Sequence, residues 1–149
     1  MQFSSRFAIA IHMFACIDTF GADHKVTSKF LAGSINVNPV IIRQILGKLK
    51  AAGLLNSKQG SSGIRIAKDP EEISLLDIFQ ALEMIDHNQL FGFHENPSTD
   101  CVVGRNIHYI LDDRLESIQQ VLEEKLSSIR LSEVLADTEK YVNEKNVKK

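Results

Sequence analysis

Two adjacent residues, Arg43 and Gln44, have the side chains that read base pairs in duplex DNA. Arginine can donate two parallel hydrogen bonds to O6 and N7 of guanine, and glutamine can accept from N6 and donate to N7 of adenine. Lys48, Lys58 and Arg65 follow within the next two dozen residues. Lysine and arginine at such positions suit contacts with phosphate oxygens. These residues therefore predict DNA recognition, with base choice in the first pair and phosphate contacts in the others.

The charge of the chain is divided between two regions. The formal net charge is −2, yet residues 24–68 contain eight Lys or Arg and no Asp or Glu. From residue 69 onward there are eight basic and seventeen acidic residues. Local potential decides what a surface attracts, so the first region predicts a cationic module despite the negative total. Chance clustering on a solvated surface is the alternative.

The basic pair lies in a segment with clear helix signals. Asn38 is a good N-cap, and Pro39 suits the first helical position because its fixed φ is already helical. Gly53 supplies a left-handed stop after the helix. The segment also has an apolar stripe at helical spacing, which would face the core while the basic residues face outward. The stripe consists of Ile42, Ile45, Leu46 and Leu49.

Short elements on both sides of this helix would position it. Residues 54–58 and 64–67 read as strands joined by the glycine-containing loop 59–63, which predicts a hairpin. Upstream, we expect a buried helix over 3–20 and a second helix over 27–32, with a turn over 33–37. An ordinary helical hairpin would fit the upstream helices alone. The basic hairpin favours a winged helix-turn-helix, a mainly α fold with a small β-hairpin wing.

The second half of the chain is expected to be helical. Ser74 and Asp77 form a capping box for a helix from Leu75 to about Met84. A long helix over 101–129 and a last short helix over 131–142 complete the chain. We expect a winged-helix domain over 1–84, and a linker loop, a dimerisation helix and a C-terminal helix over 85–149. The long helix carries an apolar seam that predicts pairing with a second copy: Ile107, Leu111, Leu115, Ile118, Leu122, Leu126 and Ile129.

Several segments together resemble the Rrf-two family of bacterial winged-helix transcription regulators, in its YwnA-like branch. They read V-T-S-K-F-L-A, V-N-P-V-I-I-R-Q-I-L-G-K-L-K-A-A-G-L-L, G-S-S-G-I-R-I-A, D-P-E-E-I-S-L-L-D-I-F-Q-A-L-E and N-P-S-T-D-C-V-V-G-R-N-I. The resemblance implies a homodimer that inserts one recognition helix per subunit into a major groove, and we expect repression. The usual glycine triplet of the wing is reduced here to Gly60-Ser61-Ser62-Gly63. The residues expected at the DNA are Ser28, Lys29, Asn38, Pro39, Val40, Arg43, Gln44, Lys48, Lys58, Gln59, Gly60, Ser61, Ser62 and Arg65.

The two cysteines bear on cofactor and signal. Family members that bind an iron-sulfur cluster carry three cysteines between the helix after the wing and the long helix. This chain has only Cys101 in that region. We therefore expect no iron-sulfur cluster. Cys101 follows three capping residues at the start of the long helix, where a thiol pKa can be lowered, so it is a candidate thiol sensor. An inert Cys101 with a small-molecule signal in the aromatic segment 90–94 is the alternative. Cys16 reads as a core residue.

Other functions have weaker support in the sequence. His and acidic residues crowd the segment 86–101, but no spacing matches a zinc or calcium motif, and we expect no bound metal. No catalytic triad can be assembled, so we expect no enzyme. Two cysteines suit a reducing compartment, and the apolar run 7–17 is too short to span a membrane, so a cytoplasmic protein is expected. A winged-helix module that binds another protein remains the alternative function.

Overall fold

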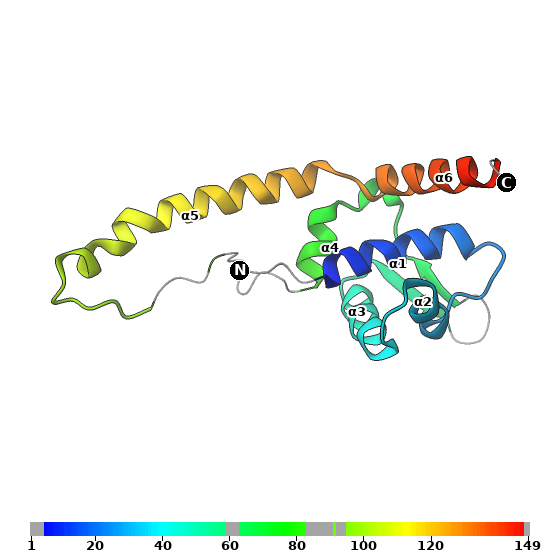
Figure 1. Cartoon of the computed structure of the whole chain (residues 1–149), viewed down its shortest axis with the longest axis horizontal. Coiled ribbons are helices and arrows are strands. Elements are labelled where there is room, and N and C mark those ends of the chain that lie inside the picture. Colours follow the sequence, from blue (N-terminus) through cyan, green and yellow to red (C-terminus); the bar gives the residue numbers. More distant parts are fainter. Residues whose placement is uncertain (1–4, 59–62, 83–90, 92–94, 148–149) are drawn as a thin grey trace.

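The computed structural model describes residues 5–58, 63–82, 91 and 95–147. Helices dominate these residues, with one two-stranded antiparallel sheet among them (Figure 1). The order is α1 (Arg6–Phe20), α2 (Ser28–Ile35), α3 (Pro39–Ala51), β1 (Leu55–Lys58), β2 (Gly63–Ile66), a 3-10 turn η1 (Pro70–Glu72), α4 (Leu75–Ala81), α5 (Val102–Ser128) and α6 (Leu131–Val147).

The helix-turn-helix consists of α2 and α3. Thr27 Oγ1 accepts a hydrogen bond from Phe30 N at 3.1 Å and caps α2 as expected. The expected turn at 33–37 is wrong in its first residues, because α2 continues to Ile35. Asn36 then takes the left-handed conformation (φ 61°) that ends the helix. At α3 the prediction is confirmed: Asn38 Oδ1 accepts from Val40 N at 2.9 Å, and the helix ends at Ala51.

The hairpin follows α3 directly. Gly53 has φ 76°, and the chain then enters β1, which pairs with β2 so that Leu55 faces Ile66. At the start of β2, Gly63 lies so close to Val26 that a Cβ atom would come within 2.4 Å of the Val26 carbonyl oxygen. Its φ of 74° also favours glycine. This contact ties the hairpin to the segment between α1 and α2.

The core extends beyond the N-terminal elements. The capping box of α4 is confirmed, with Asp77 N donating to Ser74 Oγ (3.1 Å) and Ser74 N donating to Asp77 Oδ2 (2.9 Å). This helix ends at Ala81 rather than near Met84. Leu131 and Leu135 of α6 are buried in the same hydrophobic cluster as α1, α2 and α3. As a result α6 lies alongside α1 (Figure 1).

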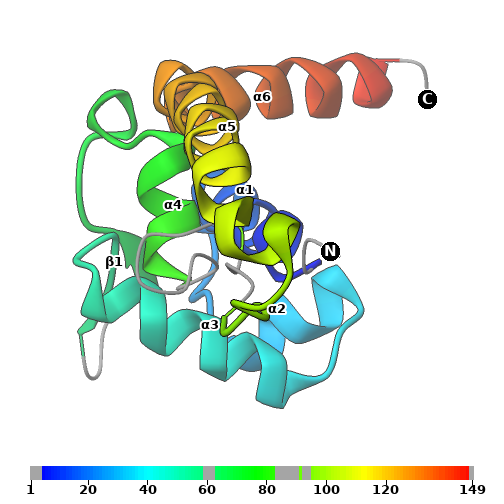
Figure 2. The same ribbon diagram turned by 90° about the vertical axis from the view of Figure 1, so that its left-hand side faces the viewer.

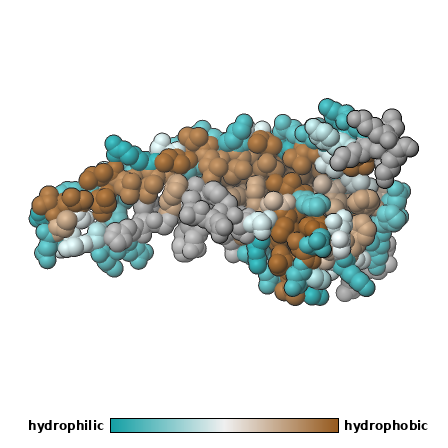
Figure 3. Space-filling model, viewed as in Figure 1, coloured by the Kyte–Doolittle hydropathy of each residue, from teal (hydrophilic) through white to brown (hydrophobic). Residues whose placement is uncertain are grey.

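The long helix α5 is the exception to this packing. It has 27 residues and not one of them is buried, and it extends away from the rest of the molecule (Figure 1). A band of apolar side chains runs along it (Figure 3). The C-terminal helix reaches Val147 and is longer than the expected 131–142. Among the described residues, none of the helices combines the length and apolar character needed to cross a bilayer.

Candidate nucleic-acid interface

The recognition helix α3 lies on the side of the molecule opposite α5 and α6 (Figure 2). Its first turns expose Val40, Arg43 and Gln44, while the predicted inward stripe is buried. Val40 is 50% exposed and could contact a thymine methyl group. Lys29, in the first turn of α2, is also exposed, and α2 packs against α3. Asn38 and Pro39 are exposed at the start of α3, and Ser28 is half-buried at the start of α2.

Arg6 is a residue of this surface that the sequence did not reveal. Its Nη2 atom donates a hydrogen bond of 3.0 Å to Oε1 of Gln44, although the two residues are 38 positions apart. Arginine has only donors, so this bond requires the carbonyl oxygen of Gln44 to face Arg6. That oxygen keeps a second lone pair and can still accept from adenine. The first turn of α1 therefore orients one of the two residues expected to read bases.

Lys48 does not lie on the exposed face of α3, where it was expected. Its side chain is half-buried, and Nζ donates to the carbonyl oxygen of Leu82 at 3.3 Å. Leu82 is the C-cap of α4, and the last carbonyl groups of a helix have no partner within the helix. Because α4 packs against α3, Lys48 satisfies one of them. The expectation that Lys48 is exposed is wrong for this reason.

This contact predicts a loss of stability in Lys48→Met, which keeps the apolar stem and removes the ammonium group. Hydrogen bonds to charged groups contribute about 1.5–3 kcal/mol, so the free energy of unfolding should fall by about 1–2 kcal/mol at this partly exposed site. Urea unfolding followed by circular dichroism measures it. Lys50→Met is the matched control, since Lys50 is exposed and bonds Ser57 Oγ on the surface. Equal unfolding free energies for the two variants would contradict the assignment.

Arg65 is also less exposed than expected. It is half-buried, and its guanidinium lies against the end of α1: a Cβ atom on Gly21 would be 2.6 Å from Nη1 of Arg65. The small size of Gly21 thus makes room for the arginine. The side chain of Lys58 and the wing residues Gln59, Gly60, Ser61 and Ser62 lie outside the described residues.

Exposed apolar side chains on α5 are not confined to the predicted seam. Ile118 and Leu111 of the seam are 53% and 39% exposed, whereas Leu126 and Ile129 pack against the core. The remaining seam residues, Ile107, Leu115 and Leu122, are half-buried. Further large apolar side chains are exposed on the same helix and were not part of the seam. They are Val102, Val103, Tyr109, Ile110 and Val121.

Cys101 is the N-cap residue of α5 and is exposed. The backbone N–H groups of Gly104 and Val103 at the start of α5 lower the pKa of its thiol from the ordinary 9.0, because they stabilise the thiolate. Gly104 allows the preceding loop to approach, since a Cβ atom there would come within 2.3 Å of the Ser98 carbonyl oxygen. Cys16, in contrast, is buried on α1 beside Ser34 Oγ (3.6 Å).

A winged helix-turn-helix with an exposed basic recognition helix defines the class of DNA-binding regulators. Residues 3–137 match the profile of the Rrf2 (Rrf-two) family, described as "Iron-dependent Transcriptional regulator". The chain is 39% identical over 132 residues to YwnA of Bacillus subtilis (strain 168), which is named as an HTH-type transcriptional regulator; the match covers 89% of this chain and 96% of YwnA. The chain belongs to the Rrf2 family of transcriptional regulators, and it is not an enzyme.

Solved structures agree with this assignment. One crystal structure, of a protein described as DNA-binding, has a TM-score of 0.69 and 36% identity, and the match covers 88% of this chain and 99% of that one. IscR of T. potens (TM-score 0.68, 21% identity, 95% and 90% covered) shares the fold. So does CymR, the global cysteine regulator of B. subtilis (TM-score 0.64, 18% identity, 91% and 97% covered). The predicted fold class is therefore confirmed.

The family description raises the question of iron, and the donor set does not fit an iron-sulfur cluster. Such a cluster takes about four protein ligands, most often cysteine thiolates. The whole chain has two cysteines, and Cys16 is buried in the core. The part of the chain that the structure describes contains no group of three His, Cys, Asp or Glu side chains placed to hold a metal ion. His87 and His94, the two histidines of the segment 86–101, lie outside the described residues.

Proposed function

We propose that this regulator is a homodimer that binds an inverted-repeat operator and represses transcription by occupying promoter DNA. The observation that carries the proposal is the exposed pair Arg43 and Gln44 on a recognition helix within a region free of acidic residues. Charged side chains are usually depleted at the centre of protein interfaces, so this surface suits DNA better than a protein partner. A repressor acts on chromosomal DNA, and we infer a cytoplasmic location.

The exposed apolar band of α5 supports the dimer. Large apolar patches are rarely left open to water in monomeric proteins and mark association sites. The helix is about 40 Å long at 1.5 Å per residue, so two copies could cross over a large area. A two-fold axis between them would place two recognition helices on one face of the duplex and would require inverted half-sites.

Selection of bound sites from genomic fragments, followed by fluorescence anisotropy at physiological salt, tests this function. We expect an inverted repeat that is bound about 10³-fold or more tightly than random DNA of the same length. The control is a fragment with one half-site scrambled, which should lose most of the affinity. Equal binding of selected and random DNA would remove the specific-regulator proposal and favour a protein-binding module.

We also propose that Cys101 is a thiol switch through which oxidants act on the regulator. The lowered thiol pKa predicts that alkylation by iodoacetamide reaches half of its maximal rate at a lower pH in the native protein than in urea, because more thiolate is present at each pH. Mass spectrometry of Cys101 across a pH series measures this. Equal midpoints in native and unfolded protein would contradict the lowered pKa.

The switch itself requires a change in DNA binding. Peroxide, diamide or an electrophile should alter operator affinity of the wild type, and Cys101→Ser should abolish the response while keeping the reduced-state affinity. Cys16→Ser is the matched control, because that thiol is buried and should not contribute. If none of the three reagents changes the operator affinity of the wild type, Cys101 is a structural residue and not a switch.

A further inference from the structure

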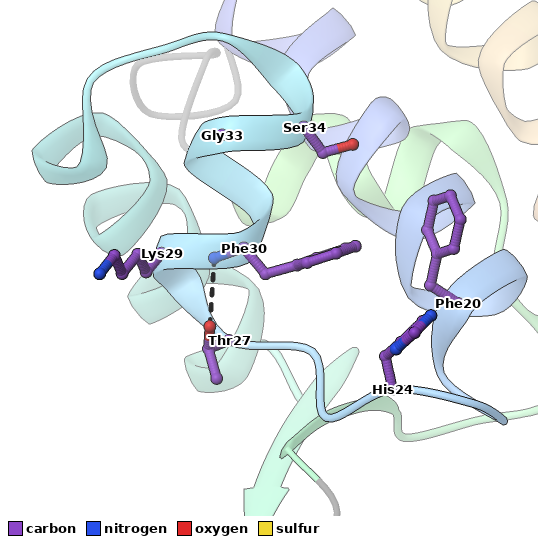
Figure 4. Close-up of a pocket in the computed structure, with 7 residues that line it drawn as sticks. All are labelled: Phe20, His24, Thr27, Lys29, Phe30, Gly33 and Ser34. Atoms are coloured by element: carbon purple, nitrogen blue, oxygen red, sulfur yellow. Dashed lines mark hydrogen bonds between the residues drawn. The ribbon is translucent and has the colours of Figure 1, made fainter.

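An aromatic hollow lies between the end of α1 and the outer face of α2. It is an open surface hollow with a volume of about 700 Å³. The rings of Phe20, His24 and Phe30 and the hydroxyl group of Ser34 point into the same space, whereas Lys29 points away from it (Figure 4). Gly33 adds no side chain and leaves the space open. Phe20 at the end of α1, His24 in the connection between the helices, and Phe30 and Ser34 of α2 therefore face a shared hollow.

Core packing accounts for Phe30, which is half-buried against the core, but not for the other two rings. Phe20 is 36% exposed and His24 is exposed, and neither belongs to the hydrophobic core cluster. The Phe20 and Phe30 rings meet edge to face with centroids 5.5 Å apart, and the His24 ring lies nearly parallel to Phe30 (26°) at 6.4 Å. Such walls offer both ring edges and ring faces to a flat guest. The hollow therefore has the shape and chemistry of a site for one aromatic ring.

Two kinds of ligand bind at aromatic sites, and the charge around the hollow favours one of them. Aromatic rings can bind cations over their faces, or they can stack on a flat apolar ring. Here Lys29 is at the rim of the site, no Asp or Glu lines it, and residues 24–68 contain no acid, so the local potential opposes a cation despite the neighbouring Asp23. The Ser34 hydroxyl and a His24 ring N–H group can donate to an anionic oxygen. A ring with a carboxylate satisfies both requirements.

We propose that this hollow binds a single-ring aromatic carboxylate and that its occupancy changes DNA binding through α2. The second part rests on the proposed function, because Ser28 and Lys29 in the first turn of α2 are expected at the DNA. Phe30 belongs to the same turn, and its backbone N–H donates to the cap residue Thr27. A ligand that moves the Phe30 ring therefore acts on the turn that presents Lys29.

Benzoate is the probe for the first part, titrated into the full-length protein and followed by two-dimensional NMR. We expect amide shifts centred on residues 20–34, and binding about tenfold weaker for cyclohexanecarboxylate, which lacks the ring faces, and for benzyltrimethylammonium, which carries the opposite charge. Phe20→Ala should weaken benzoate binding about tenfold. Tyr141→Ala is the matched control, since it removes an exposed aromatic side chain from α6, away from the hollow, and should leave benzoate binding unchanged.

The outcomes separate this site from the proposed function. Shifts outside residues 20–34, equal binding of the two carboxylates or preference for the cation would overturn the site. Operator affinity, measured with and without saturating benzoate, tests the coupling: a change that Phe20→Ala removes supports it, and an unchanged affinity overturns it. Benzoate binding in a protein that recognises no operator would leave the site standing and remove only the DNA function.

Discussion

Replacing Leu122 by glutamate is expected to convert the dimer into a monomer. Leu122 belongs to the apolar seam in the C-terminal third of α5 and is not part of the hydrophobic core cluster of the protomer. A carboxylate placed in a dry interface without a partner costs several kcal/mol, and two-fold symmetry places two of them there. Light scattering on the purified variant at micromolar concentration measures the change in mass.

Gln120→Glu is the matched control for this variant. It adds the same charge to the same helix, but about 200° around the axis from Leu122, where the side chain is exposed. We expect it to stay dimeric and to keep operator affinity, whereas Leu122→Glu should lose the affinity that depends on both half-sites. Circular dichroism should show the same helical content in both. A wild-type protein that is monomeric at micromolar concentration would contradict the dimer.

Arg43→Ala is expected to relax base choice at one operator position and to weaken binding by about 1–3 kcal/mol. The exposed guanidinium can form two parallel bonds to guanine, and both bonds are lost in alanine. Anisotropy titrations with the selected operator and its single-base variants measure the effect. The wild type should discriminate strongly at one guanine, and the variant should bind all four bases there with similar affinity.

Arg43→Lys is the control that separates charge from geometry. Lysine keeps the positive charge but lacks the planar guanidinium group with its paired donors. The variant should therefore still be attracted to DNA phosphates but should not prefer guanine. Lys29→Ala should instead weaken every sequence alike and reduce the slope of affinity against salt by about one unit. If Arg43→Ala also weakened all sequences equally, Arg43 would be a phosphate contact.

Local signals in the sequence account for the features that were predicted well. The caps at Asn38 and Ser74 bond to backbone groups two or three residues away, so residue types and short spacings were sufficient to place both helix starts. The left-handed residue at Gly53 was equally visible. At the end of α2, Asn36 takes this role within the predicted turn, because asparagine also tolerates the left-handed region.

Contacts between distant residues account for what the sequence did not show. Arg6 meets Gln44 across 38 positions, and Lys48 meets Leu82 across 34. Helical periodicity says which face a residue occupies, but it does not say which element packs there. Lys48 turns inward because α4 packs next to α3. This packing is a tertiary contact that helical periodicity does not reveal. The hollow beside Phe20 arises in the same way, from two helices whose ends meet.

The burial of Leu131 and Leu135 beside α1 has a consequence for the order of synthesis. The apolar surface of α1, which includes Ala10, is synthesised well before the leucines that join it in the core. At about 5–20 residues per second, the ribosome needs roughly 6–24 s to pass from Ala10 to Leu131. During that interval the nascent chain carries an incomplete core. We expect the regulator to reach its native packing only after α6 has been synthesised, so that chains released before that point leave an apolar surface open to aggregation.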